Sequence, residues 1–206
     1  QLIGVRTALV ERRPLGRQLQ LVGFVVPDES RLKRVQIRVS GWIQQLHVNR
    51  TGEPVSAGQP LLAIYSPELY QSEREFLIDQ EAGDSSGAGG PGTRDTEVRL
   101  RLLGVPDEEV QRLKRERTPA TRLVLRSPIA GTVLERGVVE GQYVGADTPL
   151  FSLADLSRVW VLADLYEMDM GRVKAGDRVR FVADALPGRP FEGTVQFIYP
   201  TISNQT

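Results

Sequence analysis

Residues 41–64 read GWIQQLHVNRTGEPVSAGQPLLAI, and residues 131–153 read GTVLERGVVEGQYVGADTPLFSL. Both stretches open on a glycine, place a second glycine three residues before a valine, and end on Pro-Leu with further apolar residues. The matched pairs are Gly41 with Gly131, Gly52 with Gly141, Val55 with Val144, Pro60 with Pro149, and Leu61 with Leu150. Short apolar runs separated by Gly, Pro and Asn are typical of short strands joined by tight turns. The repeat therefore predicts two similar all-β halves that build a small barrel or sandwich.

In the segment between the two copies, the apolar residues follow a helical spacing instead of a strand pattern. Ser66, Pro67 and Glu68 form a helix start, with Ser as the N-cap, Pro at the first helical position, and Glu near the positive end of the helix dipole. The residues that then share one helical face are Leu69, Phe76, Leu77 and Gln80. A helix of about 16 residues would form an arm of roughly 24 Å.

The sequence predicts that this arm folds back on itself. Residues 83–92 are rich in Gly and Ser and are expected to end the helix and form a flexible tip. A second helix from about residue 95 to residue 103 would carry Val98, Leu102 and Val105 on one apolar stripe. Gly104 should end that helix, and Pro106 should begin a short third helix with Val110 and Leu113 facing inward. We expect the apolar faces of the arm to pack against each other.

Strands are predicted on both sides of the repeat. Residues 19–26 and 35–39 precede it, and residues 159–163, 178–182 and 191–197 come after it. The C-terminal strands form a second β unit that we expect to recruit residues 19–26. Residues 159–163 should be a buried strand, and Trp42 and Trp160 should be core residues of the two β units.

Composition excludes several classes of function. Lys and Arg together number 26, as do Asp and Glu, so no net charge favours nucleic acid or an anionic membrane. The chain has no Cys, one His, and no phosphate-binding motif such as GxxxxGK[ST]. With no catalytic constellation in the sequence, we do not expect an enzyme.

Five stretches carry a family resemblance: GWI at 41–43, GQPLLAIYSPEL at 58–69, RLLG at 101–104, SPIAGTV at 127–133 and LSRVWV at 156–161. With the split repeat and the arm, they resemble a periplasmic adaptor, also called a membrane fusion protein. The resemblance is closest to the heavy-metal branch, such as the copper/silver adaptors that work with resistance-nodulation-division (RND) pumps. It implies a mainly β fold with an inserted α-helical hairpin, in which a lipoyl/biotinyl-like barrel-sandwich hybrid is joined to a β-barrel domain.

The resemblance also implies a division into domains. We expect a partial membrane-proximal domain at residues 1–14 and 201–206, and a β-barrel domain at residues 15–28 and 156–200. The lipoyl-like domain is expected at residues 29–65 and 120–155, and the helical hairpin at residues 66–119. The first and last residues do not look like natural termini, so a leader or anchor is expected outside this sequence. The expected place of action is the periplasm, in association with the inner membrane.

The partners that the resemblance implies are an inner-membrane RND transporter, an outer-membrane channel and further copies of the chain in a ring, expected to be a hexamer. The expected cargo is a heavy-metal cation. The Arg-Leu-Ser tip signature of drug-efflux adaptors is absent, and the tip residues that we name as interface candidates are Gly83, Gly87, Gly90 and Arg94. Two alternatives stay open: an adaptor of an ABC-type exporter, and a lipoyl or biotinyl carrier domain. The carrier needs a modified Lys at the join of the two halves, where the insertion offers only Lys114.

Metal-binding residues are few. We expect no cofactor and leave open transient contact with a heavy-metal ion. Thioethers suit Cu(I) and Ag(I), and imidazole suits several transition metals, so Met168, Met170 and His47 are candidates. His47 is expected on a strand, and the two Met would share a face only in a strand. The carboxylates that could bind a hard cation are Asp164, Glu167 and Asp169. The N-terminal Met cluster of copper/silver adaptors is not in this chain.

Overall fold

The computed structural model describes residues 9–10, 18–86 and 91–199. The chain divides into two compact units. The larger unit is Val25–Trp160, and the smaller combines Gln1–Phe24 with Val161–Thr206.

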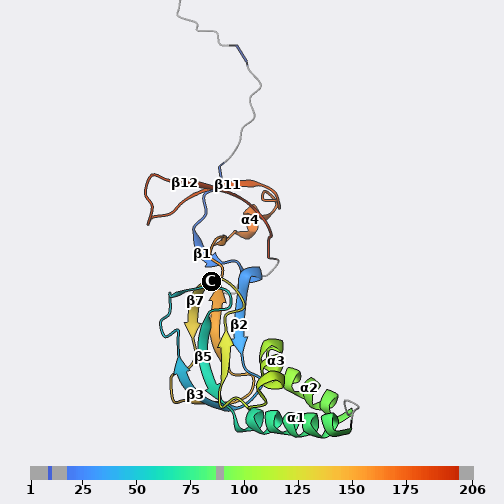
Figure 1. The fold of residues 1–206 in the computed structure, drawn as a ribbon. Coiled ribbons are helices and arrows are strands. Elements are labelled where there is room, and N and C mark those ends of the chain that lie inside the picture. The colour runs from blue at the N-terminus through green and yellow to red at the C-terminus, as the bar shows by residue number, and fades with distance from the viewer. Residues whose placement is uncertain (1–8, 11–17, 87–90, 200–206) are drawn as a thin grey trace, which may run out of the picture. The chain divides into compact units, whose positions relative to one another are not determined.

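The larger unit is built on two four-stranded antiparallel sheets (Figure 1). One sheet has the order β2-β9-β7-β4, with bounds Leu32–Gln36, Pro149–Ala154, Gly131–Arg136 and Pro54–Val55. The other has the order β6-β5-β3-β8, with bounds Leu123–Arg126, Pro60–Tyr65, Gly41–Leu46 and Tyr143–Val144. A short 3-10 helix, Glu29–Arg31, precedes β2. We call these two sheets together the sandwich.

The two copies of the sequence repeat occupy equivalent places in the sandwich. Strands β2–β5 form the first half and β6–β9 the second, and exchanging the halves converts one sheet order into the other. Each half contributes two strands to each sheet, so neither half forms a sheet alone. The backbone bonds repeat as well: the Gly52 N–H donates to the Val133 carbonyl at 2.7 Å, and the Gly141 N–H donates to the Ile43 carbonyl at 2.8 Å.

Glycine is required at the shared positions of the repeat for two separate physical reasons. A Cβ atom on Gly41 would lie 2.2 Å from the Tyr65 carbonyl oxygen, and one on Gly131 would lie 2.4 Å from the Ala154 carbonyl oxygen. No side chain fits at that distance, so both positions require glycine. Gly52 and Gly141 instead adopt φ values of +86° and +81°, the left-handed region that L side chains disfavour.

One continuous apolar core runs from the sandwich into the base of the helices. Its fully buried residues include matched positions of the repeat, such as Leu61 and Leu150. Helix residues in the same core include Leu69, Phe76, Leu100, Val110 and Leu113. The arm is therefore anchored on the sandwich through shared packing.

Three helices join β5 to β6: α1 Pro67–Ser86, α2 Pro91–Leu102 and α3 Asp107–Glu116. In Figure 1, α1 and α2 run side by side away from the sandwich, and α3 lies near their base. The prediction that the first helix ends at residue 83 was wrong, because α1 continues to Ser86, and α2 already begins at Pro91. At 20 residues, α1 is about 30 Å long. The end of α2 before Gly104, which has φ +89°, is confirmed.

The smaller unit contains the hairpin β11–β12, Arg178–Val182 with Pro190–Thr194, and the short helix α4, Glu167–Met170. Strands β1, Gly23–Pro27, and β10, Val159–Ala163, cross the boundary between the two units and pair with each other. Part of residues 19–26 is therefore recruited by β10, in a two-stranded sheet separate from the β11–β12 hairpin. The prediction of a buried strand at 159–163 was wrong, because its residues are exposed except for half-buried Trp160. The last strand is shorter than predicted.

Trp42 is 45% exposed, so its predicted place in the core was wrong. Side chains alternate across a strand, and Gly41 and Ile43 take the buried positions on either side of Trp42. Trp42 instead packs on the outer face of its sheet against Tyr143, with ring centroids 4.8 Å apart, and against Tyr65 at 6.4 Å. These rings are cross-strand neighbours, which are favourable pairs in a sheet.

Candidate functional site

The helical arm begins as the sequence predicts. The buried Ser66 hydroxyl accepts a hydrogen bond from the Leu69 N–H at 3.3 Å, and Pro67 is the first helical residue. This cap satisfies one of the free N–H groups at the start of α1. The arm therefore leaves the sandwich in a fixed direction directly after β5, at the join of the two halves.

Apolar packing and ion pairs hold the three helices together. Phe76 on α1 and Leu100 on α2 are fully buried. Lys114 on α3 lies over the Phe76 ring, 5.9 Å from its centroid, and pairs with Glu97 at 2.7 Å. The only Lys of the insertion is thus held on a helix and paired with a carboxylate, in contrast to the exposed turn that a carrier lysine requires.

A buried carboxylate closes the base of the arm. Glu73 on α1 is 3% exposed and accepts a hydrogen bond from the Ala120 N–H at 2.6 Å. Burial raises the pKa of Glu73 above its ordinary value of 4.5, while the Ala120 hydrogen bond and the charge of Arg112 act in the opposite direction. Glu109 adds a further upward contribution. Glu73 therefore ties the chain that returns to β6 onto α1.

Some apolar residues of the arm that were expected to pack inward are exposed instead. Val98 and Leu102 are more than half exposed, as is Ile78 on α1. The predicted inward stripe was therefore wrong for Val98 and Leu102, whereas its third residue, Val105, is buried in the core; on α2 itself, Leu100 packs inward. The i, i+4 spacing of Val98 and Leu102 does mark a common face of α2, but this face points to solvent.

The predicted tip residues are only partly described. Gly83 lies within α1 and is buried, and Arg94 is exposed on α2. Gly87 and Gly90 lie outside the described residues. Near the tip, the Thr93 hydroxyl donates to the Asp79 carbonyl at 3.1 Å, which fastens the start of α2 to α1. The role of these residues as an interface stays a prediction.

The candidate metal ligands do not converge within their own units. His47 is exposed in a bend after the end of β3, so its expected strand position was wrong. Met168 and Met170 lie on helix α4, where residues two apart point to different sides. Asp169 pairs with Arg172 at 2.8 Å. Within the described part of the chain, no three His, Cys, Asp or Glu side chains lie close enough to hold a metal ion.

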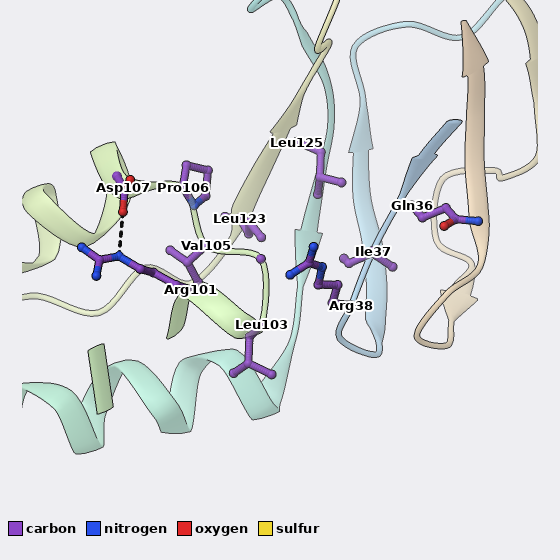
Figure 2. Close-up of a pocket in the computed structure, with 11 residues that line it drawn as sticks. Gln36, Ile37, Arg38, Arg101, Leu103, Val105, Pro106, Asp107, Leu123 and Leu125 are labelled. Atoms are coloured by element: carbon purple, nitrogen blue, oxygen red, sulfur yellow. Dashed lines mark hydrogen bonds and ion pairs between the residues drawn. The ribbon is translucent and has the colours of Figure 1, made fainter. Parts of the chain in front are cut away.

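Sequence reasoning missed a pocket at the base of the arm. It lies where the turn between α2 and α3, residues 103–106, and the first residue of α3 face residues 36–38 and strand β6 (Figure 2). Because its walls come from three separated stretches, no local pattern marks it. Gly104, which adopts a positive φ, is visible in the sequence, but a glycine at a helix end is common and does not indicate a pocket.

Comparison with known families decides where the chain belongs. The family model described as CusB, barrel-sandwich hybrid domain, matches residues 32–154, which include the sandwich and the whole arm. The chain belongs to the CusB family. A second model, described as CusB-like, beta-barrel domain, matches residues 158–206. The heavy-metal membrane fusion protein resemblance drawn from the sequence is confirmed, and so is the predicted fold class.

Individual relatives agree with this family. The chain is 28% identical over 189 residues to the cation efflux system protein CusB of Escherichia coli strain K12, covering 92% of this chain and 46% of the relative. It is 25% identical over 212 residues to the cation efflux system protein CzcB of Alcaligenes sp. strain CT14, covering 91% and 40%. The chain thus spans about half the length of the curated relatives it matches.

Among solved structures, ZneB from Cupriavidus metallidurans has a similar fold, with a TM-score of 0.57 and 22% identity over 87% of this chain and 84% of that one. At this identity the similarity concerns the fold alone. In the described part of the chain, no helix combines the length and the apolar character needed to span a bilayer.

Proposed function

We propose that this CusB-family chain is part of a periplasmic adaptor that links an inner-membrane RND pump to an outer-membrane channel and serves the export of heavy-metal cations. The names of the relatives, cation efflux system proteins, support the cation as cargo. Adaptors of this family are not enzymes. Here the chain acts by assembly.

The observation that carries the proposal is the position of the arm. It interrupts the sandwich at the join of its halves, is fixed there by the Ser66 cap and the shared core, and leaves Ile78, Val98 and Leu102 exposed. Large apolar side chains that remain exposed on a packed helical pair favour a protein partner. The proposed partner of the arm is the outer-membrane channel.

The remaining parts of the assembly are proposed from the family. Copies of the chain would form a ring, expected to be a hexamer, around the export route. The sandwich and the smaller unit would both contribute to this ring. The protein would act in the periplasm, held at the inner membrane by a leader or anchor.

Charge substitutions on the exposed face of α2 test the proposal. The full-length protein carrying Val98→Asp and Leu102→Asp is expressed with its pump and channel in a strain that lacks its own copy. We expect metal tolerance to fall to that of the strain without the adaptor, because buried charges disrupt an apolar interface. The readout is growth across a series of copper, silver and zinc salts.

The matched control is Val98→Ile with Leu102→Met, which keeps the face apolar and should retain tolerance. Both variants should retain the helical circular dichroism and thermal unfolding of the parent, since the two side chains are exposed. Full metal tolerance in the aspartate variant would contradict a role for this face in assembly.

A further inference from the structure

The pocket at the base of the arm has a volume of about 460 Å³, within the size range of small-molecule sites. Its sandwich side includes Ile37 and Leu123, both less than a tenth exposed, together with half-buried Leu125. Its arm side includes Leu103 and Val105. Apolar side chains thus line the pocket from both the arm and the sandwich.

Arg38 adds a cation to the lining of this pocket. Figure 2 shows its side chain in the space between the turn after α2 and the strand that carries Leu125. The stem of Arg38 packs beside Gly104, where an added Cβ would lie 3.6 Å from the Arg38 Cδ atom. Its guanidinium donates one hydrogen bond, from Nη1 to the Leu102 carbonyl at 3.3 Å. A guanidinium has five N–H donors, so most remain available.

The second arginine of the pocket is already neutralised. Arg101 binds Asp107 at 2.8 Å and Glu97 at 2.8 Å. Arg38, by contrast, pairs with no carboxylate among the residues that the structure describes. The pocket therefore presents a single uncompensated positive charge on a lining that is polar and apolar in about equal parts.

We propose that this pocket binds an amphipathic monocarboxylate, with the carboxylate on the Arg38 guanidinium and an alkyl chain against half-buried Leu103 and Leu125. A guanidinium binds a carboxylate through two parallel hydrogen bonds, which makes it the fitting partner for one planar anion. Because the walls come from the arm and the sandwich, the bound molecule contacts both and restrains the arm against the sandwich.

Titration with sodium decanoate tests the proposal on the ¹⁵N-labelled chain. We expect saturable shifts of the backbone amides of residues 103–105, 123 and 125. Arg38→Gln should weaken decanoate binding at least about tenfold, because a charge-assisted hydrogen bond pair is lost. Decanol, which has the same chain without the charge, should bind the parent as weakly as decanoate binds Arg38→Gln.

The matched control is Arg50→Gln, which removes an exposed arginine outside the pocket and should leave decanoate affinity unchanged. Arg38 is also exposed, so its variant should retain the parent spectrum, and this is checked before titration. The proposal is overturned by equal decanoate affinity in the parent and Arg38→Gln, by equal affinity of the parent for decanol and decanoate, or by unsaturable shifts spread over the whole chain.

Discussion

The two halves of the sandwich differ mainly in the segment to which each one leads. Strands β2–β5 and β6–β9 have equivalent pairing partners, equivalent glycines and equivalent buried leucines. Yet Tyr65 at the end of the first half leads into the arm, whereas Ala154 at the end of the second leads toward β10. The features that the halves share build the domain, and the arm that only one of them carries is the surface that we propose for a partner.

Alanine at the first shared glycine should have the largest effect. Gly41→Ala and Gly131→Ala should each destabilise the chain by about 3 kcal/mol or more, because the added Cβ would meet a carbonyl oxygen of the partner strand. Urea unfolding measures both. The control is Gly145→Ala, where the nearest atom, Thr148 Oγ1, is 4.0 Å away. A tolerated alanine at only one of the two positions would break the equivalence of the halves.

Alanine at the second shared glycine should have a smaller effect. Gly52→Ala and Gly141→Ala place a side chain in open space, so only the left-handed backbone is penalised. We expect each to cost about 1 kcal/mol in the same urea unfolding experiment. Equal losses of stability in Gly52→Ala and Gly141→Ala would support the equivalence of the two halves. A loss as large as that of Gly41→Ala would show that contacts, and not backbone conformation, require glycine at this position.

The smallest expected change in stability is that of Glu73→Gln in the arm, which only the first half carries. The folded pKa of Glu73 lies above 4.5, so folded protein takes up this proton more readily than unfolded protein. The contribution of Glu73 to stability is therefore fully present below pH 4.5 and is lost as the pH rises through the folded pKa. Relative to Glu73→Gln, the parent should become progressively less stable over this rise in pH.

Urea unfolding of both proteins between about pH 4 and pH 8 measures this difference. The control is Glu75→Gln, since Glu75 lies on the same helix but is exposed and paired with Arg99. A difference between the parent and Glu73→Gln that stays constant with pH would contradict the raised pKa.

The repeat, the helix start at Ser66 and the short third helix were all predictable, because each depends on local spacing or on a turn residue. The exposure of Trp42 could also have been predicted, since strand alternation with Gly41 and Ile43 assigns its side chain to the outer face of the sheet. The direction of Val98 and Leu102 was not predictable, because spacing identifies a common face but not which face packs inward. The pocket was not predictable, because it forms only when Arg38 and Gly104, which are 66 positions apart in the sequence, come together in the fold.

Replacing the arm by a turn tests most directly that the sandwich is one domain with an insertion. Ile64 on β5 pairs with Leu123 on β6 in antiparallel register, so a two-residue Asn-Gly turn can join Tyr65 to Arg122. In the ¹H–¹⁵N correlation spectrum of this variant, we predict dispersed amide signals for β2–β9 close to their parent positions, except near the arm base. Collapsed, undispersed signals for these strands would contradict the account.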